Sequence, residues 1–327
     1  MKAQRDVWGD TVAEIGLTDP SIVLVDGDLA NSTKADRFAR EFPDRFIEVG
    51  IAEQNMVGIA FGLSTLGYRP WLSTFAVFLT HRALDPIRML VSQTGANVRL
   101  AGAYSGLLNG SSGKTHQDVE DLAIMRAMPN MTVLAPADEV EAAAVTRWAS
   151  DHEGPVYVRI ARDAVRQVLP HDYTFRLGEA VTLRADGDIV LVSTGVQSSR
   201  VVEAADLLAA AGIRARVVHL PTIKPLNEAS LLDSLKGASL LITVEEHTVI
   251  GGLGGAVCEV LGNYPTSPRV VRLGLDDQWS ESGPDDFLLD KYGLSAQRVA
   301  EQVRSAVTTH EAAIASSGAA TREEGIR

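Results

Sequence analysis

Apolar runs alternate with amphipathic stretches along the first half of the chain. The β-branched runs predict strands at 21–28, 69–78, 97–104, 131–137 and 154–162. Helical patterns lie between them at 53–66, 81–94 and 138–151, and the apolar run 121–128 belongs to the same alternation. Such alternation is typical of crossover units, so we expect a mainly parallel sheet covered by helices, closing near residue 165.

A second alternation begins after residue 188. It predicts strands at 189–195, 214–226, 239–247 and 269–275 and helices at 197–211, 252–262 and 295–307. The stretch before it has a proline, mixed polarity and a turn, as surface connectors do. We therefore predict an α/β fold of two consecutive three-layer α/β domains, each with a mainly parallel sheet. The expected parts are domains at 1–168 and 189–308, a linker at 169–188 and a flexible tail at 309–327.

The predicted helix in GIAEQNMVGIAFGLSTLG (50–67) is apolar on nearly every side. A helix of this kind is usually buried. Gly58 and Gly62 share one side of it, which favours close packing against another helix or subunit. Glu53 enters the interior at the start of this helix, and a buried carboxylate requires a charged partner, hydrogen bonds or a proton. We expect a specific group to meet Glu53 there.

Composition narrows the class of protein. The 30 Lys and Arg residues against 42 Asp and Glu give a net charge of −12, which argues against a nucleic-acid binder. The single cysteine, Cys258, excludes an internal disulfide and a multi-cysteine metal site. A secretory signal is not recognisable, and no apolar run reaches the length of a membrane span, so we expect a cytoplasmic protein without a membrane partner.

Two further segments are candidates for chemistry. The glycine-rich loop 104–123 leaves a predicted strand where parallel sheets usually bind ligands, which makes His116 a candidate acid or base. Spacing alone favours a plain helix cap for this segment. Phe75, Phe78 and His81 stand three apart, and spacing alone favours core packing for them over a cofactor platform.

Three blocks of sequence together are similar to one enzyme family. The blocks GIAEQNMVGIAFGLSTLGYRPWLSTFAVF, GKTHQDVEDLAIMRAMPNMTVLAPADEVE and GPVYVRIARD resemble the pyrimidine-binding domain of the transketolase family, which uses thiamine diphosphate. The resemblance covers roughly residues 5–165. The region after 185, with TIKPL and EEHTVIGGLGG, is similar to the C-terminal domain of the same family. The implied folds are the pyrimidine-binding fold and the transketolase C-terminal-like fold.

The resemblance implies a set of cofactor contacts. The family glutamate that matches Glu53 touches N1′ of the aminopyrimidine ring, and burial suits it to share a proton with that nitrogen. Phe75 and Phe78 match aromatic residues that stack on the ring, which reverses the choice made from spacing. His81 stands where the family often has tyrosine. The implied cofactor-binding residues are Glu53, Phe75, Phe78, His81, Asp28 and Leu29.

The resemblance also implies substrate contacts. His116 matches a catalytic histidine that hydrogen-bonds the donor near its C1 hydroxyl, and Ser32 and Arg162 match positions that hold a sugar phosphate. A structural salt bridge is the alternative role for Arg162. Ser112 replaces an aspartate that reads the C2 hydroxyl, and Tyr104 replaces a phosphate-binding histidine. We therefore expect a donor that differs from the usual pentose phosphate.

The family's diphosphate-binding domain is not recognisable in this sequence. That domain carries Gly-Asp-Gly followed by Asn and binds the diphosphate and Mg²⁺, so a partner subunit is implied, with an α₂β₂ assembly and no metal ligands in this chain. The implied activity is transfer of a two-carbon ketol unit from a ketose, as a small sugar or sugar phosphate, to an aldose. A 2-oxoacid dehydrogenase β subunit and a noncatalytic scaffold subunit are the alternatives.

Overall fold

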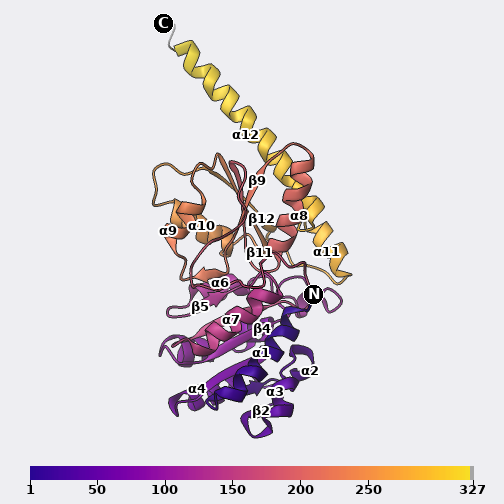
Figure 1. Cartoon of the computed structure of the whole chain (residues 1–327), viewed down its shortest axis with the longest axis vertical. Coiled ribbons are helices and arrows are strands. Elements are labelled where there is room, and N and C mark those ends of the chain that lie inside the picture. The colour runs from indigo at the N-terminus through magenta and orange to yellow at the C-terminus, as the bar shows by residue number, and fades with distance from the viewer. Residues whose placement is uncertain (325–327) are drawn as a thin grey trace.

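Two sheets organise the structure. The computed structural model describes residues 1–324, with side chains as far as residue 316. Figure 1 shows the first domain, from indigo to magenta, below the second, from orange to yellow. The first half contains α1 (Gln4–Thr18), β1 (Ile22–Asp26), α2 (Ala30–Thr33), α3 (Asp36–Glu41), β2 (Phe46–Glu48), α4 (Glu53–Thr65), β3 (Arg69–Phe75), α5 (Leu84–Pro86), β4 (Arg99–Ala103), α6 (Asp121–Ala127), β5 (Thr132–Leu134), α7 (Glu139–Asp151) and β6 (Val156–Ile160).

The first sheet has seven strands in the order β10-β5-β6-β4-β3-β1-β2, and only its edge strand β10 (Thr222–Lys224) is antiparallel. One face packs against Trp8 and Val12 of α1 and Val145 of α7. The other face packs against Met56 of α4 and Met125 of α6. Helices on both faces of a nearly continuous apolar sheet are what a parallel sheet requires.

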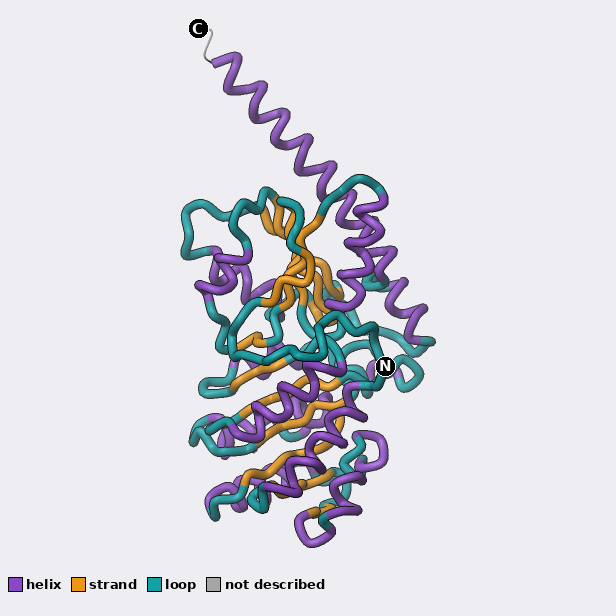
Figure 2. The backbone as a smooth tube through the Cα atoms, in the orientation of Figure 1, coloured by secondary structure: helices purple, strands orange, loops and turns teal. Residues whose placement is uncertain are grey.

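The second sheet has five strands in the order β12-β11-β8-β9-β7, all parallel except β7. Its elements are β7 (Val181–Arg184), β8 (Ile189–Ser193), α8 (Gln197–Ala210), β9 (Ala215–His219), α9 (Glu228–Ser234), β11 (Leu240–Thr248), α10 (Leu253–Leu261), β12 (Arg269–Leu275), α11 (Asp285–Lys291) and α12 (Ala296–Glu324). Helices α8 and α12 cover one face and α10 the other, as Figure 2 also shows. The predicted fold class is therefore confirmed.

The chain crosses between the domains after β9. The predicted strand 214–226 is in fact two strands, because Pro221, which has no N–H to donate to a ladder, separates β9 from β10. β10 then leaves the second sheet and pairs with β5 of the first. Strand β7, which lies inside the expected linker 169–188, pairs with β9 at the edge of the second sheet. The two domains are therefore tied by backbone pairing as well as by side chains.

The last helix is longer than the sequence pattern predicts. Helix α12 continues to Glu324, whereas the expected helix ends at residue 307 and a flexible tail begins at 309. The extension is rich in Ala and Glu, which are strong helix formers even without an apolar face. Figure 1 shows this helix projecting from the second domain. The final three positions of the expected tail lie outside the described residues.

Arginines and buried carboxylates lie where the domains meet, and a hydrogen bond from Arg159 crosses from one domain to the other. Arg159 of β6 binds Asp121 at 3.0 Å and donates to the backbone carbonyl of Glu246 at 2.8 Å. Arg200 binds the Glu246 carboxylate at 2.7 Å. Each of these carboxylates pairs with an arginine, as buried charges require, while the second oxygen of Asp121 has no hydrogen-bond partner among the described residues. Among the helices of the described residues, none combines the length and apolar character needed to span a bilayer.

Candidate functional site

The carboxyl ends of β1, β3 and β4 bring aromatic and polar residues together. In the sheet register Asp26 lies opposite Ser73, and Phe75 lies opposite Ala103, so these strands end at one edge. The chain turns sharply there, because Asp28 and Tyr104 have φ of 66° and 59°. Such backbone conformations are uncommon outside glycine and gather at functional sites. This is the edge at which parallel sheets usually bind ligands.

Aromatic rings form a compact cluster at this edge. The ring of Phe75 stacks on Tyr104 with centroids 4.2 Å apart and on Phe78 at 5.8 Å. Leu29 packs against the same cluster. His116 meets Phe78 edge-on at 5.5 Å and Phe75 at 6.1 Å, so the long loop folds back over the cluster. The structure thus brings together four predicted residues from distant segments, along with Leu29 itself.

Glu53 begins α4 and is 1% exposed. The group that meets it within this chain is Arg82, whose Nη1 donates to both carboxylate oxygens at 2.8 Å. The guanidinium also lies 4.5 Å from the centroid of the Phe78 ring. Of the three ways to stabilise the buried carboxylate, the structure shows a charged partner. Sequence reasoning missed Arg82, although a cation directly after the Phe75–Phe78–His81 segment was a usable signal.

His81 turns to a different set of partners. Phe78–Arg82 forms a π-helical turn, so a spacing of three does not place His81 on the phenylalanine face as an α-helix would. Its Nε2 lies 3.1 Å from Glu120, and its Nδ1 lies 2.8 Å from the Thr80 hydroxyl, which donates to Asp118. The hydrogen bond that the His81 ring donates to Glu120 raises the pKa of His81, and burial raises the pKa of Asp118 to about 7.

A second cluster of cations surrounds Tyr104. Arg5 donates to the Tyr104 hydroxyl and, at 3.0 Å, to the Ser32 carbonyl. The guanidinium carbons of Arg5 and Arg162 lie 5.2 and 5.6 Å from the centre of the Tyr104 ring. Both arginines bury an Nε atom that has no hydrogen-bond partner among the described residues. The cluster can therefore bind an anion, and Arg5 is a residue that sequence reasoning did not select.

Ser112 lies further out than the other predicted residues. It is exposed, and its hydroxyl donates to the Asn109 side chain at 3.0 Å. Its neighbour Ser111 lines an open cavity of about 480 Å³ together with Arg162, Ser282, Gly283, Pro284 and Asp285. The cavity runs from the Tyr104 cluster toward the second domain. Asp28 is also exposed at the sheet edge, where its backbone N–H donates to Glu48 at 2.9 Å.

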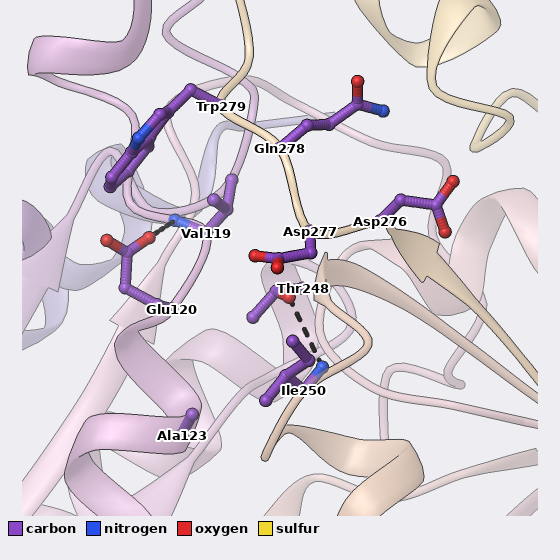
Figure 3. Close-up of a pocket in the computed structure, with 9 residues that line it drawn as sticks. All are labelled: Val119, Glu120, Ala123, Thr248, Ile250, Asp276, Asp277, Gln278 and Trp279. Atoms are coloured by element: carbon purple, nitrogen blue, oxygen red, sulfur yellow. Dashed lines mark hydrogen bonds between the residues drawn. The ribbon is translucent and has the colours of Figure 1, made fainter.

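A separate pocket of about 390 Å³ lies between the domains (Figure 3). It is lined by Val119, Glu120, Ala123, Thr248, Ile250, Asp276, Asp277, Gln278 and Trp279. Figure 3 shows Trp279 on the side of Val119 and Glu120. Through Glu120 the pocket adjoins His81, but its lining is distinct from the aromatic cluster and from Glu53.

Asp26, at the end of β1, is a buried acid whose protonation changes the charge at this edge of the sheet. One oxygen accepts from the Leu29 N–H at 2.7 Å, and the other has no hydrogen-bond partner among the described residues. Burial raises the pKa of Asp26 to about 7. An unfolded aspartate has a pKa of about 3.9, so the folded chain binds the extra proton between those values.

We expect Asp26→Asn to flatten the dependence of stability on pH. In the native chain the folded state holds the Asp26 proton that the unfolded state releases, so the free energy of unfolding falls as pH rises from about 4 to about 7. The neutral amide removes this contribution, and Asp118 leaves a residual slope of the same sign. Thermal melts between about pH 4 and pH 7 measure the slope of stability against pH, and Asp44→Asn, at an exposed position, is the control. An unaltered slope in Asp26→Asn contradicts the assignment.

Comparison with known families assigns the two α/β domains to a class of enzymes that use thiamine diphosphate. The family models for the transketolase pyrimidine-binding domain and the transketolase C-terminal domain match residues 1–167 and 178–299. The chain belongs to the transketolase family. The recognition made from the sequence is confirmed.

Relatives of similar length support this assignment. A protein of Methanocaldococcus jannaschii described as a transketolase C-terminal section is 38% identical over 92% of this chain and 95% of its own length. A 6-deoxy-6-sulfo-D-fructose transketolase subunit of Clostridium sp. (strain MSTE9) is 37% identical over 90% of this chain and 91% of its own. A solved split-gene transketolase, described as an inactive beta4 tetramer, has a TM-score of 0.87 at 42% identity, covering 94% and 99% of the two chains. The chain is thus a transketolase-type subunit for ketol transfer between a ketose and an aldose.

Proposed function

We propose that this chain supplies the pyrimidine half of a thiamine diphosphate site that is completed by a partner subunit. The observation that supports this most strongly is Glu53, buried to 1% exposure, whose partner Arg82 also lies over the ring of Phe78 in the stacked pair with Phe75. A flat ring that stacks on the phenylalanines would reach the carboxylate from the side on which Arg82 now lies. The residues present therefore fit the ring of the cofactor.

The residues of this chain divide the work at the cofactor. When bound, thiamine diphosphate supplies the electron sink that allows the C2–C3 bond of the donor ketose to break. Glu53 would hold a proton at N1′ of the pyrimidine, while Phe75 and Phe78 fix the plane of the ring. Asp28 and Leu29 would border the thiazolium end and the substrate channel. His81, bound to Glu120, would shape the rim of the site without stacking on the ring.

His116 is the proposed substrate-orienting residue. Its ring lies over the aromatic cluster, 5.5 Å from Phe78, and its Nδ1 contacts the Thr115 hydroxyl at 2.8 Å. The other ring nitrogen is thereby available to the substrate. In that position it can donate a hydrogen bond near the C1 hydroxyl and carbonyl of the donor, where negative charge develops as the carbonyl is attacked.

The donor sugar is proposed to carry a terminal anionic group. Arg5 and Arg162 both lie against the Tyr104 ring, Arg5 also binds the Ser32 carbonyl, and arginine offers a planar fork suited to phosphate or sulfonate oxygens. One relative is described as a 6-deoxy-6-sulfo-D-fructose transketolase subunit, which supports a donor with an anionic end. Ser112, with its neutral hydroxyl, is proposed to recognise the C2 hydroxyl of the donor less strictly than the family aspartate does.

Arg162→Ala should weaken the binding of an anionic donor more than that of a neutral donor. A hydrogen bond to a charged group contributes about 1.5–3 kcal/mol, so KM for a phosphorylated or sulfonated ketose should rise by about 10- to 100-fold. KM for a ketose without an anionic group should change little. Steady-state kinetics with both donors on the assembled enzyme test this. Equal losses for both donors would favour the alternative that Arg162 has a structural role.

The partner is proposed to be an N-terminal transketolase subunit with the Gly-Asp-Gly and Asn diphosphate site, which would bind Mg²⁺. The solved relative supports this, because a tetramer of that chain alone is described as inactive. We propose an α₂β₂ assembly with the cofactor at the interfaces, and in it Gly58 and Gly62 of α4 are open to a close contact. The 2-oxoacid dehydrogenase alternative is not favoured by the transketolase family matches.

The experiment that tests the proposal is reconstitution. The protein encoded beside this chain is co-purified with it, and calorimetry measures binding of thiamine diphosphate with Mg²⁺ to each chain and to the mixture. We expect tight binding and ketol transfer only in the mixture. Full activity of this chain alone, or a mixture that binds no cofactor, would contradict the proposal.

A further inference from the structure

The ion pair of Glu53 with Arg82 joins a buried residue to an exposed one. Glu53 is 1% exposed, whereas the side chain of Arg82 is 44% exposed. Arg82 ends a π-helical turn, and its backbone carbonyl accepts from Gln54 at 3.1 Å. The backbone is therefore held against α4, while the long side chain reaches inward from the rim. An arginine in this situation can withdraw into solvent without a change in the fold.

The guanidinium has the features that the site needs in its ligand. It is flat and lies over the Phe78 ring, 4.5 Å from the centroid. It also donates N–H hydrogen bonds to the buried carboxylate, at 2.8 Å to each oxygen. A pyrimidine ring with a protonated N1′ would present the same planar face and the same kind of donor. Two such groups cannot use one carboxylate and one phenylalanine face together.

We propose that Arg82 is a positioning residue that occupies the pyrimidine subsite while the site is empty and is displaced when the cofactor binds. This inference rests on the proposed function of Glu53. In the empty site Arg82 balances the charge of Glu53 and keeps the carboxylate oriented between α4 and the aromatic cluster. Every binding event then breaks that pair, so the affinity for cofactor is lowered by the strength of the contact.

The test is cofactor affinity in the assembled enzyme. Calorimetry with thiamine diphosphate and Mg²⁺ compares the native complex with Arg82→Met, which keeps an apolar stem of similar length but removes the charge. We expect Arg82→Met to bind at least about tenfold tighter, since a charge-assisted hydrogen bond no longer has to be broken. Arg88→Met, an exposed arginine nearby, is the matched control and should leave affinity unchanged.

A double-mutant cycle shows whether Arg82 acts through Glu53. In a Glu53→Gln complex, which lacks the buried charge, adding Arg82→Met should change affinity less than twofold. This pair of variants also serves if the single Arg82→Met chain folds poorly, because it leaves no unpaired charge. Melting temperatures without cofactor give a second measure, and Arg82→Met should melt lower alone but gain more on addition of cofactor.

The outcomes separate this inference from the proposed function. A native complex that binds no thiamine diphosphate overturns both. A native complex that binds it, with an Arg82→Met complex that binds equally or more weakly, overturns the displacement of Arg82 alone. An equal effect of Arg82→Met in the native and Glu53→Gln backgrounds overturns it as well, because the arginine would then act independently of the carboxylate.

Discussion

Replacing Glu53 with glutamine is expected to lower kcat of the assembled enzyme by about 10²- to 10⁴-fold, the range that proton transfer by a positioned side chain contributes. Glutamine has nearly the same shape and keeps the hydrogen-bonding groups, so cofactor placement should be retained. It cannot hold or release the proton that the pyrimidine N1′ requires. Steady-state ketol transfer at saturating cofactor measures the loss.

Glu14→Gln is the matched control for this change. Glu14 is also a helical glutamate paired with an arginine, but it is exposed on α1, where it binds Arg147 at 2.7 Å. Surface pairs of this kind contribute about 0–1 kcal/mol, so activity should stay within twofold. A Glu53→Gln enzyme with native turnover would show that the buried carboxylate has no catalytic role and would favour a scaffold subunit.

His116→Ala is expected to lower kcat by about 10²- to 10³-fold, similar to the loss of a single donor aimed at developing negative charge. The ring lies against Phe75 and Phe78, so its removal leaves the cofactor platform itself in place. KM for the donor should rise less than kcat falls, because the hydrogen bond strengthens as the carbonyl is attacked.

The same variant decides between the two roles that the sequence allows for this histidine. His171→Ala, at an exposed position of the connector, is the control and should retain native kinetics. If His116 only caps a surface helix, its alanine variant will keep native kcat and show a lower melting temperature. That pattern would remove His116 from the site.

The alternating pattern was enough to predict the two sheets and the sheet edge at which the site lies, whereas the roles of Phe75, Phe78 and His116 came from the family resemblance. Parallel strands end at a common edge, so residues that follow or close these strands are expected at that edge. They are Asp28, Phe75 and Tyr104. The unbroken apolar character of α4 likewise marked Glu53 as buried. Local periodicity reports such features, because each depends on one segment and on the side it buries.

The partners of these residues were harder to predict, because they depend on contacts between distant segments. Arg5 lies 99 positions before Tyr104, and no pattern links the two. Arg82 was not selected from the sequence, and His81 has other partners than α-helical spacing predicts, because the turn that holds both residues is π-helical. β10 pairs with β5 across the expected domain boundary, and only the tertiary fold sets that pairing.

The most direct test of the central role of Glu53 is the exchange of the thiazolium C2 proton of bound thiamine diphosphate for deuterium, followed by NMR in the reconstituted complex. This measurement needs no substrate and isolates the step that Glu53 is proposed to support. We predict rapid exchange in the native complex and exchange near that of free cofactor in the Glu53→Gln complex. Equal, rapid exchange in both complexes would contradict the account.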